Sequence, residues 1–195
     1  MMNKTVHIAF QILLILLFIG ASDALPGGDS DLSREYRLKA GLIFNLTKFV
    51  DYPVESAESA HDCFRIGILG NDPFKEEIEI LNGKIIQEKK IEVVRYKSIE
   101  EIGECRMLFI SSSEIINRSQ IIEALKSKKI LTLSDMDGFS EAGGMIHFIT
   151  VNNRIRFKVN LFRVREAGLK LSSHFLRLAI IVDPAKIQKD DSDPK

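Results

Sequence analysis

The sequence predicts an α/β fold, a single layered domain around a mixed, mostly parallel central sheet. Two observations carry this prediction. Short apolar runs typical of strands alternate with helical segments through the middle of the chain, as in parallel sheets with crossover helices. Two strands then follow each other directly as a hairpin, ahead of two closing helices. We place the domain at residues 25–183.

A long N-terminal helix is expected to end near Val50. Tyr36, Ala40 and Ile43 recur at spacings of three and four, which is the period of a buried helical stripe. Pro53 closes this region, because the residue before a proline avoids the helical conformation.

The remaining elements follow from apolar periodicity and turn residues. Asn152 and residue 153 suit the left-handed geometry of a hairpin turn. Asn160 is expected to cap the next helix and Gly168 to end it. Strands are expected at residues 64–69, 91–96, 107–110, 130–133, 145–151 and 154–159. Helices are expected at residues 73–81, 113–125, 161–167 and 173–182.

Residues 1–24 have the pattern of a secretory signal peptide. Lys4 precedes an apolar run over residues 8–20, and a small-x-small cleavage pattern ends at Ala24. The run is shorter than the roughly 20 residues of a membrane-spanning helix. We therefore expect export with cleavage after about Ala24, with an uncleaved anchor as the alternative. Residues 184–195 are polar and are expected to form a disordered tail.

The charge balance excludes some partners. Lys and Arg number 27 and Asp and Glu 27, so the net charge is zero. Nucleic-acid binding needs a basic face that releases counterions, and anionic membranes attract basic segments. Neither partner fits, and no direct membrane insertion is expected after cleavage.

The only two cysteines are Cys63 and Cys105. In an exported protein they most simply form one disulfide. Two buried thiols or a redox-sensing bond are the alternatives that the sequence leaves open.

Two groups of residues are candidates for binding a partner or ligand. Asn71 and Asp72 follow a strand, where open α/β sheets bind ligands, although Asp72 also suits a helix cap. The other group alternates along one strand, so its cations share a face. That face is either solvated or a site for a carboxylate or acidic partner. The second group comprises Arg154, Arg156 and Lys158, with Lys170 as a further candidate.

No residue pattern indicates catalysis, a metal site or a cofactor. The histidines are not spaced to meet on one element. Ser172 precedes a helix and is better explained as its cap than as a nucleophile. Gly143 and Gly144 either form the turn before a strand or allow a ligand close to the backbone. The apolar last helix is expected in the core, or at an interface with a partner.

Several ordered blocks resemble the YfiR (HmsC-like) family of periplasmic proteins. The first block carries the family's spacing at Asn45, Lys48 and Pro53, with Tyr52 where the family usually has Trp. The blocks are KAGLIFNLTKFVDYP (39–53), RIGILGNDPF (65–74), CRMLFISSSE (105–114), ILTLSDMDGFSEAGGMIHF (130–148) and RIRFKVNLFRVREAGLKLSSHFLRLA (154–179).

The resemblance implies a regulator without enzymatic activity. Members of the family repress a membrane-bound diguanylate cyclase by binding its periplasmic sensor domain, often dimerise, and in other cases accompany sensor kinases. The expected partner is therefore the periplasmic domain of an inner-membrane signalling protein, with a homodimer as a further expectation. The alternative function is a small-ligand sensor or an input module for a membrane histidine kinase. The family's first two cysteines match Cys63 and Cys105, which supports the disulfide.

Overall fold

The computed structural model describes residues 27–53, 63–152 and 154–182. The expected signal peptide (residues 1–24) and tail (residues 184–195) lie outside the described residues. Contacts divide the chain into residues 1–32 and 33–195. Of the first unit only residues 27–32 are described, and they begin helix α2 (Gly27–Leu46). Within the described ranges, no helix has both the length and the apolar character to cross a bilayer.

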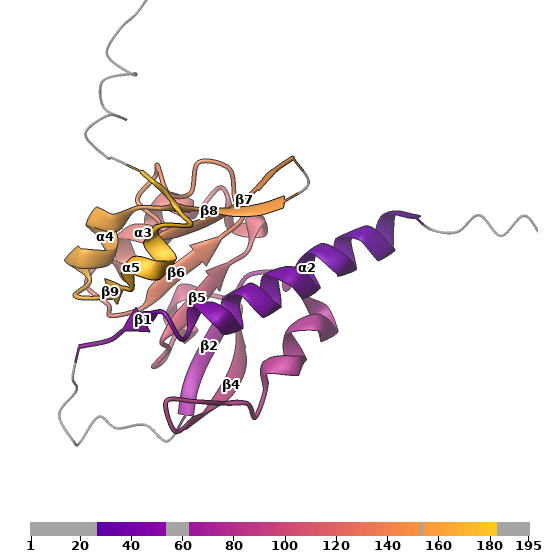
Figure 1. Ribbon diagram of the computed structural model, residues 1–195, viewed down its shortest axis with the longest axis horizontal. Helices are drawn as coiled ribbons and strands as arrows, with labels where there is room; N and C mark the ends of the chain where they lie inside the picture. The colour runs from indigo at the N-terminus through magenta and orange to yellow at the C-terminus, as the bar shows by residue number, and fades with distance from the viewer. Residues whose placement is uncertain (1–26, 54–62, 153, 183–195) are drawn as a thin grey trace, which may run out of the picture. The chain divides into compact units, whose positions relative to one another are not determined.

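An eight-stranded mixed sheet organises the second unit (Figure 1). The neighbouring strands β4, β2, β5, β6 and β7 run parallel, whereas β8, β10 and β3 at the flanks run the opposite way. The predicted mixed, mostly parallel sheet is confirmed. In sheet order the strands are β10 (Ile180–Ile181), β8 (Arg154–Val159), β7 (Ile146–Val151), β6 (Leu131–Ser134), β5 (Met107–Ile110), β2 (Cys63–Leu69), β4 (Lys89–Tyr96) and β3 (Ile85–Ile86).

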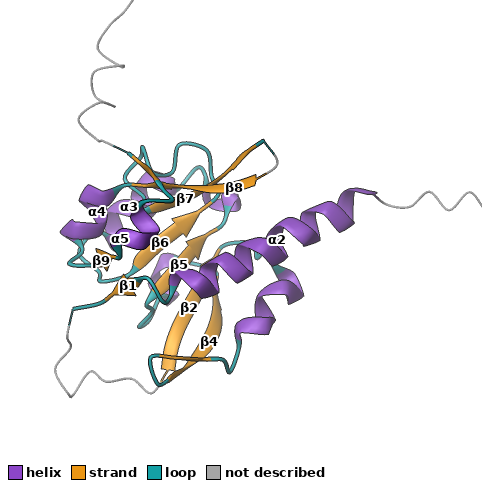
Figure 2. Ribbon diagram, viewed as in Figure 1, coloured by secondary structure: helices purple, strands orange, loops and turns teal. Residues whose placement is uncertain are grey.

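Helical segments cover both faces of the sheet (Figure 2). One face packs against α2, η2, α4 and α5, which contribute Ile43, Ile78, Val164 and Phe175 to the larger core. The other face packs against α3 through Ile121 and Leu125. The segments are α2 (Gly27–Leu46), η2 (Lys75–Leu81), η3 (Ile99–Glu101), η4 (Ser112–Glu114), α3 (Arg118–Leu125), α4 (Leu161–Glu166) and α5 (Ser173–Leu176).

The ends of α4 are capped as the sequence predicts. Asn160 Oδ1 accepts the N–H of Arg163 at 3.1 Å. Gly168 adopts φ +74° just beyond α4, a left-handed conformation that favours glycine.

The predicted cap at Asp72 is wrong in position: the next segment begins at Lys75, with Phe74 at its N-cap position, and it is a 3-10 helix rather than the predicted α-helix. Asp72 Oδ1 still accepts the N–H groups of Phe74 at 2.7 Å and Lys75 at 3.2 Å, just ahead of it.

The first helix ends earlier than predicted. Helix α2 stops at Leu46, and Val50 belongs to a strand, β1 (Val50–Asp51). This strand pairs with β9 (Lys170–Leu171) in a second, two-stranded sheet. Val50 is β-branched and completely buried there, and pairing with a distant segment outweighs its place in a helical stripe.

The last predicted helix is wrong beyond Leu176. Helix α5 ends there, and Ile180 and Ile181 form strand β10, which pairs with the second half of β8. These β-branched residues gain backbone hydrogen bonds from the edge of β8. Their side chains are 48% and 47% exposed, so the segment is not the buried helix expected from its apolar composition.

Candidate functional site

At the predicted mouth, the segment from Gly70 to Asp72 contacts a neighbouring turn and strand. Asn71 donates its N–H to Ser113 Oγ at 3.0 Å. A Cβ added to Gly70 would lie 2.5 Å from the same oxygen. Asp72 Oδ2 also accepts from Arg95 Nε at 2.8 Å. The contacts of both residues thus hold the sheet end together, and a ligand role for them stays a prediction.

The three alternating cations lie along β8, as predicted, but they do not form one uniform row. Arg154 and Arg156 are exposed, whereas Lys158 is partly buried and pairs with Glu141 at 2.6 Å. Strands β7, β6 and β5 separate β8 from β2. The β8 cations and the Asp72 region therefore belong to different sites. Lys170 lies apart from both, on the two-stranded sheet.

The edge of the sheet beside these arginines exposes apolar side chains. Strand β10 pairs only with Lys158 and Val159 of β8. Within the described residues, the first half of β8, including Arg156, has no strand on that side. Leu178, at 60% exposure, adjoins the half-exposed isoleucines of β10. We call this surface, made of Arg154, Arg156, Leu178, Ile180 and Ile181, the β8–β10 edge.

Other predicted motif residues have local roles. Asn45 and Lys48 are exposed at the end of α2, and Lys48 Nζ lies 4.7 Å from the centre of the Phe44 ring. Gly143 adopts φ +105°. A Cβ on Gly144 would lie 2.2 Å from the buried Phe139 ring. The glycine pair therefore permits a tight turn and close packing before β7.

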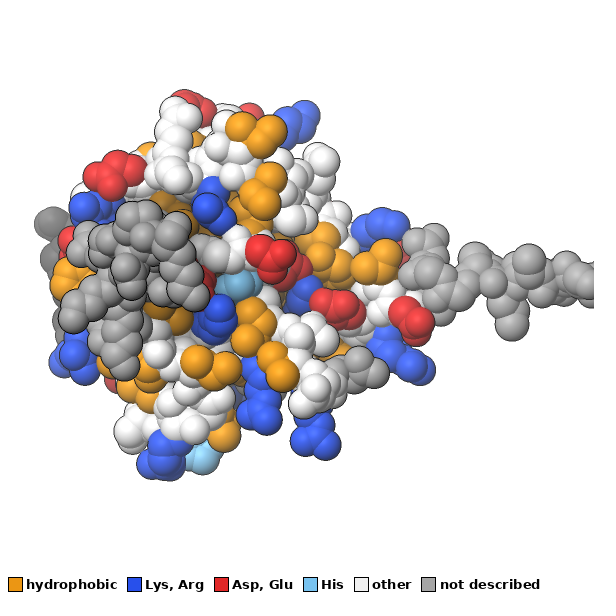
Figure 3. All heavy atoms as spheres, turned by 90° about the horizontal axis from the view of Figure 1, so that it is seen from above, with side chains coloured by type: hydrophobic (Ala, Val, Ile, Leu, Met, Phe, Trp, Pro, Cys, Tyr) orange, Lys and Arg blue, Asp and Glu red, His pale blue; other side chains and the backbone are white. Residues whose placement is uncertain are grey.

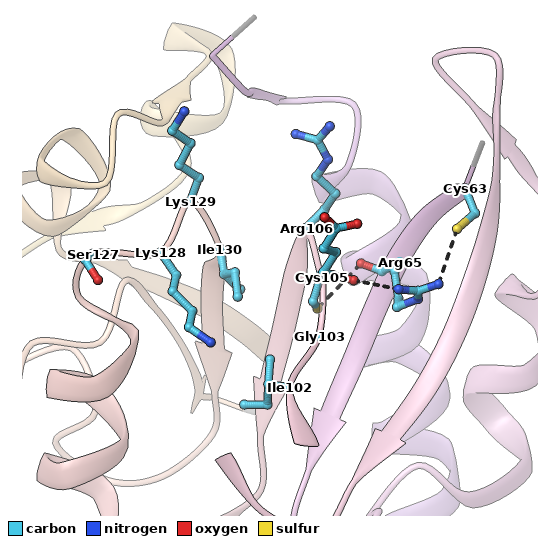
Figure 4. Close-up of a pocket in the computed structure, with 11 residues that line it drawn as sticks. Cys63, Arg65, Ile102, Gly103, Cys105, Arg106, Ser127, Lys128, Lys129 and Ile130 are labelled. Atoms are coloured by element: carbon cyan, nitrogen blue, oxygen red, sulfur yellow. Dashed lines mark hydrogen bonds between the residues drawn. The ribbon is translucent and has the colours of Figure 1, made fainter. Parts of the chain in front are cut away.

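A basic cavity of about 590 Å³ opens beside the amino ends of β2, β5 and β6 (Figure 4). Its lining carries four cationic side chains and one carboxylate, that of Glu104. Ile102, Cys105 and Ile130 are 6%, 8% and 4% exposed and form its apolar floor. The cations are Arg65, Arg106, Lys128 and Lys129.

Both cysteines line this cavity as thiols. Arg65 stands between them (Figure 4): its Nη2 lies 3.7 Å from Cys63 Sγ, and its carbonyl lies 3.7 Å from Cys105 Sγ. Cys105 also donates to the Met107 carbonyl at 2.6 Å. Burial raises the pKa of the Cys105 thiol to about 12. The disulfide between Cys63 and Cys105 stays a prediction.

A buried charged cluster lies at the opposite end of the parallel strands. Lys39 Nζ pairs with Asp135 Oδ2 at 2.6 Å and with Glu35 Oε1 at 2.7 Å. The side chains of Lys39 and Asp135 are only 4% and 10% exposed. Tyr36 donates its hydroxyl to the same Asp135 oxygen at 2.9 Å, and burial together with Asp135 raises the Tyr36 pKa.

The cluster borders a second cavity of about 450 Å³ that His147 also lines. Asp135 Oδ1 and His147 Nδ1 are buried without a hydrogen-bond partner in the described chain. Burial lowers the pKa of His147.

On the face in Figure 3, acidic, basic and hydrophobic side chains are interspersed rather than gathered by kind.

The sequence patterns did not predict this cluster. A signal was present, because Lys39 lies three residues after Tyr36 and four before Ile43, on the buried stripe of the helix. A lysine there needs a buried counter-ion. Nothing in the sequence singles out Asp135 as that counter-ion. Among residues 27–53, 63–152 and 154–182, no group of three or more His, Cys, Asp or Glu side chains is placed to bind a metal ion.

Comparison with known proteins identifies the fold's relatives. A family model described as YfiR/HmsC-like matches residues 36–180, from helix α2 to the first residue of β10. The match confirms the resemblance that the sequence blocks indicate. No curated protein matches the chain.

Proposed function

This chain belongs to the YfiR/HmsC-like family, and from that membership we propose that it binds and represses an inner-membrane signalling protein from the periplasm. The family consists of periplasmic regulators in cyclic-di-GMP signalling and is regulatory rather than catalytic. The observation that carries the proposal is the extent of the match, which includes the central sheet and both cores. The proposed partner is the periplasmic sensor domain of a diguanylate cyclase, reached after export through the N-terminal signal.

Repression by binding requires a difference in affinity between two states of the partner. A ligand that binds both states equally shifts nothing. Moving an equilibrium from 99% active to 99% inactive requires about 10⁴-fold tighter binding to the inactive state. Several well-placed side chains must therefore contact a surface that differs between those states.

The β8–β10 edge is the surface that we propose for this contact. Partly exposed Leu178, Ile180 and Ile181 supply apolar area. Arg154 and Arg156 supply guanidinium groups, which bind carboxylates in a bidentate manner. An open strand edge also accepts backbone hydrogen bonds from an added strand. Arginine is also one of the residue types enriched among those that dominate binding energy.

Deletion of the gene in its own host tests the regulatory role. We expect cellular cyclic-di-GMP to rise, and complementation with the intact gene to lower it again. Unchanged cyclic-di-GMP after deletion would count against a cyclase as the partner. Unchanged output of the host's sensor kinases as well would reject signalling repression altogether.

Once the intact gene is seen to lower cyclic-di-GMP, point variants test which surface is responsible. Ile180→Asp and Arg156→Glu should each restore high cyclic-di-GMP while the protein remains folded and exported. Ile85→Asp is the matched control, because Ile85 is 67% exposed on β3, the opposite edge of the sheet. If Ile85→Asp abolishes repression and Ile180→Asp does not, the partner binds elsewhere.

A further inference from the structure

We propose that the basic cavity lined by both cysteines binds a small organic anion, a carboxylate or phosphate on a compact apolar body. The first evidence is the charge of the side chains that line the cavity. Four cationic side chains and one carboxylate line this cavity, and Glu92 pairs with one of the cations, Arg65, at 2.8 Å. The remaining formal charge is +2, in a chain whose net charge is zero. Such a concentration of one sign in a concave site attracts an anion.

Two of the cations are held in place by neighbours. Arg65 donates to Glu92 Oε2 at 2.9 Å and to the Glu104 carbonyl at 3.0 Å. The guanidinium of Arg106 lies 4.9 Å from the centre of the Tyr52 ring. Fixed cationic groups lose less conformational entropy when a ligand binds, which favours affinity.

The two lysines of the lining contribute positive charges that a bound anion would balance. Lys128 and Lys129 form no ion pair with a described residue, whereas nearby Lys126 pairs with Glu123 at 3.8 Å. Figure 4 shows Lys128 and Lys129 on one loop and Arg106 across the cavity from it; Lys128 extends towards Ile102, whereas Lys129 and Arg106 extend the opposite way. Cations on two sides of one hollow suit an anionic group held between them.

The floor of the cavity indicates the chemical character of the part of the ligand that carries no charge. Ile102, Cys105 and Ile130 belong to the apolar core beneath the sheet, so the hollow ends on hydrophobic side chains rather than on polar ones. Inorganic phosphate would leave that floor in contact with water. A ligand with an apolar body gains by burying it, at about 25 cal/mol per Å². The geometry therefore favours an amphipathic anion over a bare one.

A titration of the purified protein with benzoate tests this inference, followed by amide chemical shifts in NMR spectra. Benzamide, which has the same ring without the charge, and inorganic phosphate, which lacks the ring, are the comparison probes. We expect benzoate at millimolar concentration to shift amides of residues 102–106 and 127–130, and both other probes to bind at least tenfold more weakly. Equal binding of benzamide or of phosphate would overturn the inference, as would the absence of shifts.

Charge reversal supplies the second arm. Lys128→Glu should weaken benzoate binding about tenfold or more, the effect of losing one hydrogen bond to a charged group. Lys126→Glu changes the net charge equally two residues away and should leave binding unchanged. Lys129→Glu replaces Lys128→Glu if that variant does not fold. Equal loss in the Lys126 variant would mean non-specific attraction and would overturn the inference. These outcomes do not depend on the signalling partner, so repression can stand or fall separately.

Discussion

Replacing the buried Lys39 with methionine should destabilise the fold strongly. The substitution keeps an unbranched side chain that is one atom shorter, and it leaves the carboxylate of Asp135, which is 10% exposed, facing only the Tyr36 hydroxyl. Removing one partner of a buried ion pair costs about 3–5 kcal/mol of unfolding free energy. For a chain of this size, that corresponds to a fall in Tm of roughly 6–20 °C.

Arg37→Ala is the matched control for this prediction. Arg37 lies on the same helix and pairs with Glu77 at 2.6 Å, the same distance as the Lys39 pair, but it is 67% exposed. Exposed ion pairs contribute about 0–1 kcal/mol. Urea unfolding followed by circular dichroism measures both variants. A cost of Lys39→Met no larger than that of Arg37→Ala would refute the role assigned to burial.

A double-mutant cycle separates the pair from its surroundings. Asp135→Asn keeps an acceptor for the Tyr36 hydroxyl and removes the charge, so the double variant Lys39→Met/Asp135→Asn has no unpaired buried ion. We expect it to be more stable than Lys39→Met alone by at least about 1 kcal/mol, within the range for contacting residues. Simple additivity of the two costs would show that the charges are not coupled.

Three further outcomes follow from single sites. Gly144→Ala should lower the free energy of unfolding in urea by about 1–3 kcal/mol, because the added Cβ would overlap a buried ring. Gly41→Ala, where a Cβ on the helix meets open space, should raise it by about 0.5–1 kcal/mol. Equal effects of the two variants would contradict this packing. Burial holds the pKa of His147 below its ordinary value, so its contribution to stability is present above about pH 6.5 and is lost as pH falls through the folded-state pKa. The fall in urea midpoint from pH 7.5 to 5 should therefore be smaller in His147→Gln, and an unchanged slope would argue against it. In reduced protein, iodoacetamide should label Cys63 well before Cys105, whose pKa is raised to about 12; mass spectrometry showing equal rates would disprove the shielding.

Local chemistry made much of the fold predictable. The sheet strands from β2 to β8, apart from β3, follow from short apolar runs of β-branched and aromatic residues, and the caps at Asn160 and Gly168 follow from side-chain and backbone requirements at helix ends. The hairpin of β3 and β4 was not predicted. Its turn places Gln87 and Glu88 at positive φ, where the usual signal is glycine or asparagine.

Distant partners decided the elements at which the predictions were wrong. Val50, Ile180 and Ile181 are apolar in helix-compatible patterns, yet each pairs with a strand that is distant in the chain. Secondary structure in such short segments depends on whether an edge is available, and that depends on the complete sheet.

The sequence by itself determined the fold class, the family and the chemical types of residue available, because periodicity, caps and ordered motif blocks act over short distances. Only the tertiary structure decided which charges meet. It buried Lys39 against Asp135, across nearly a hundred residues, and gathered Arg65, Arg106, Lys128 and Lys129 around one hollow. The energy of a charge depends on its neighbours and on its access to water, and both are properties of the folded chain.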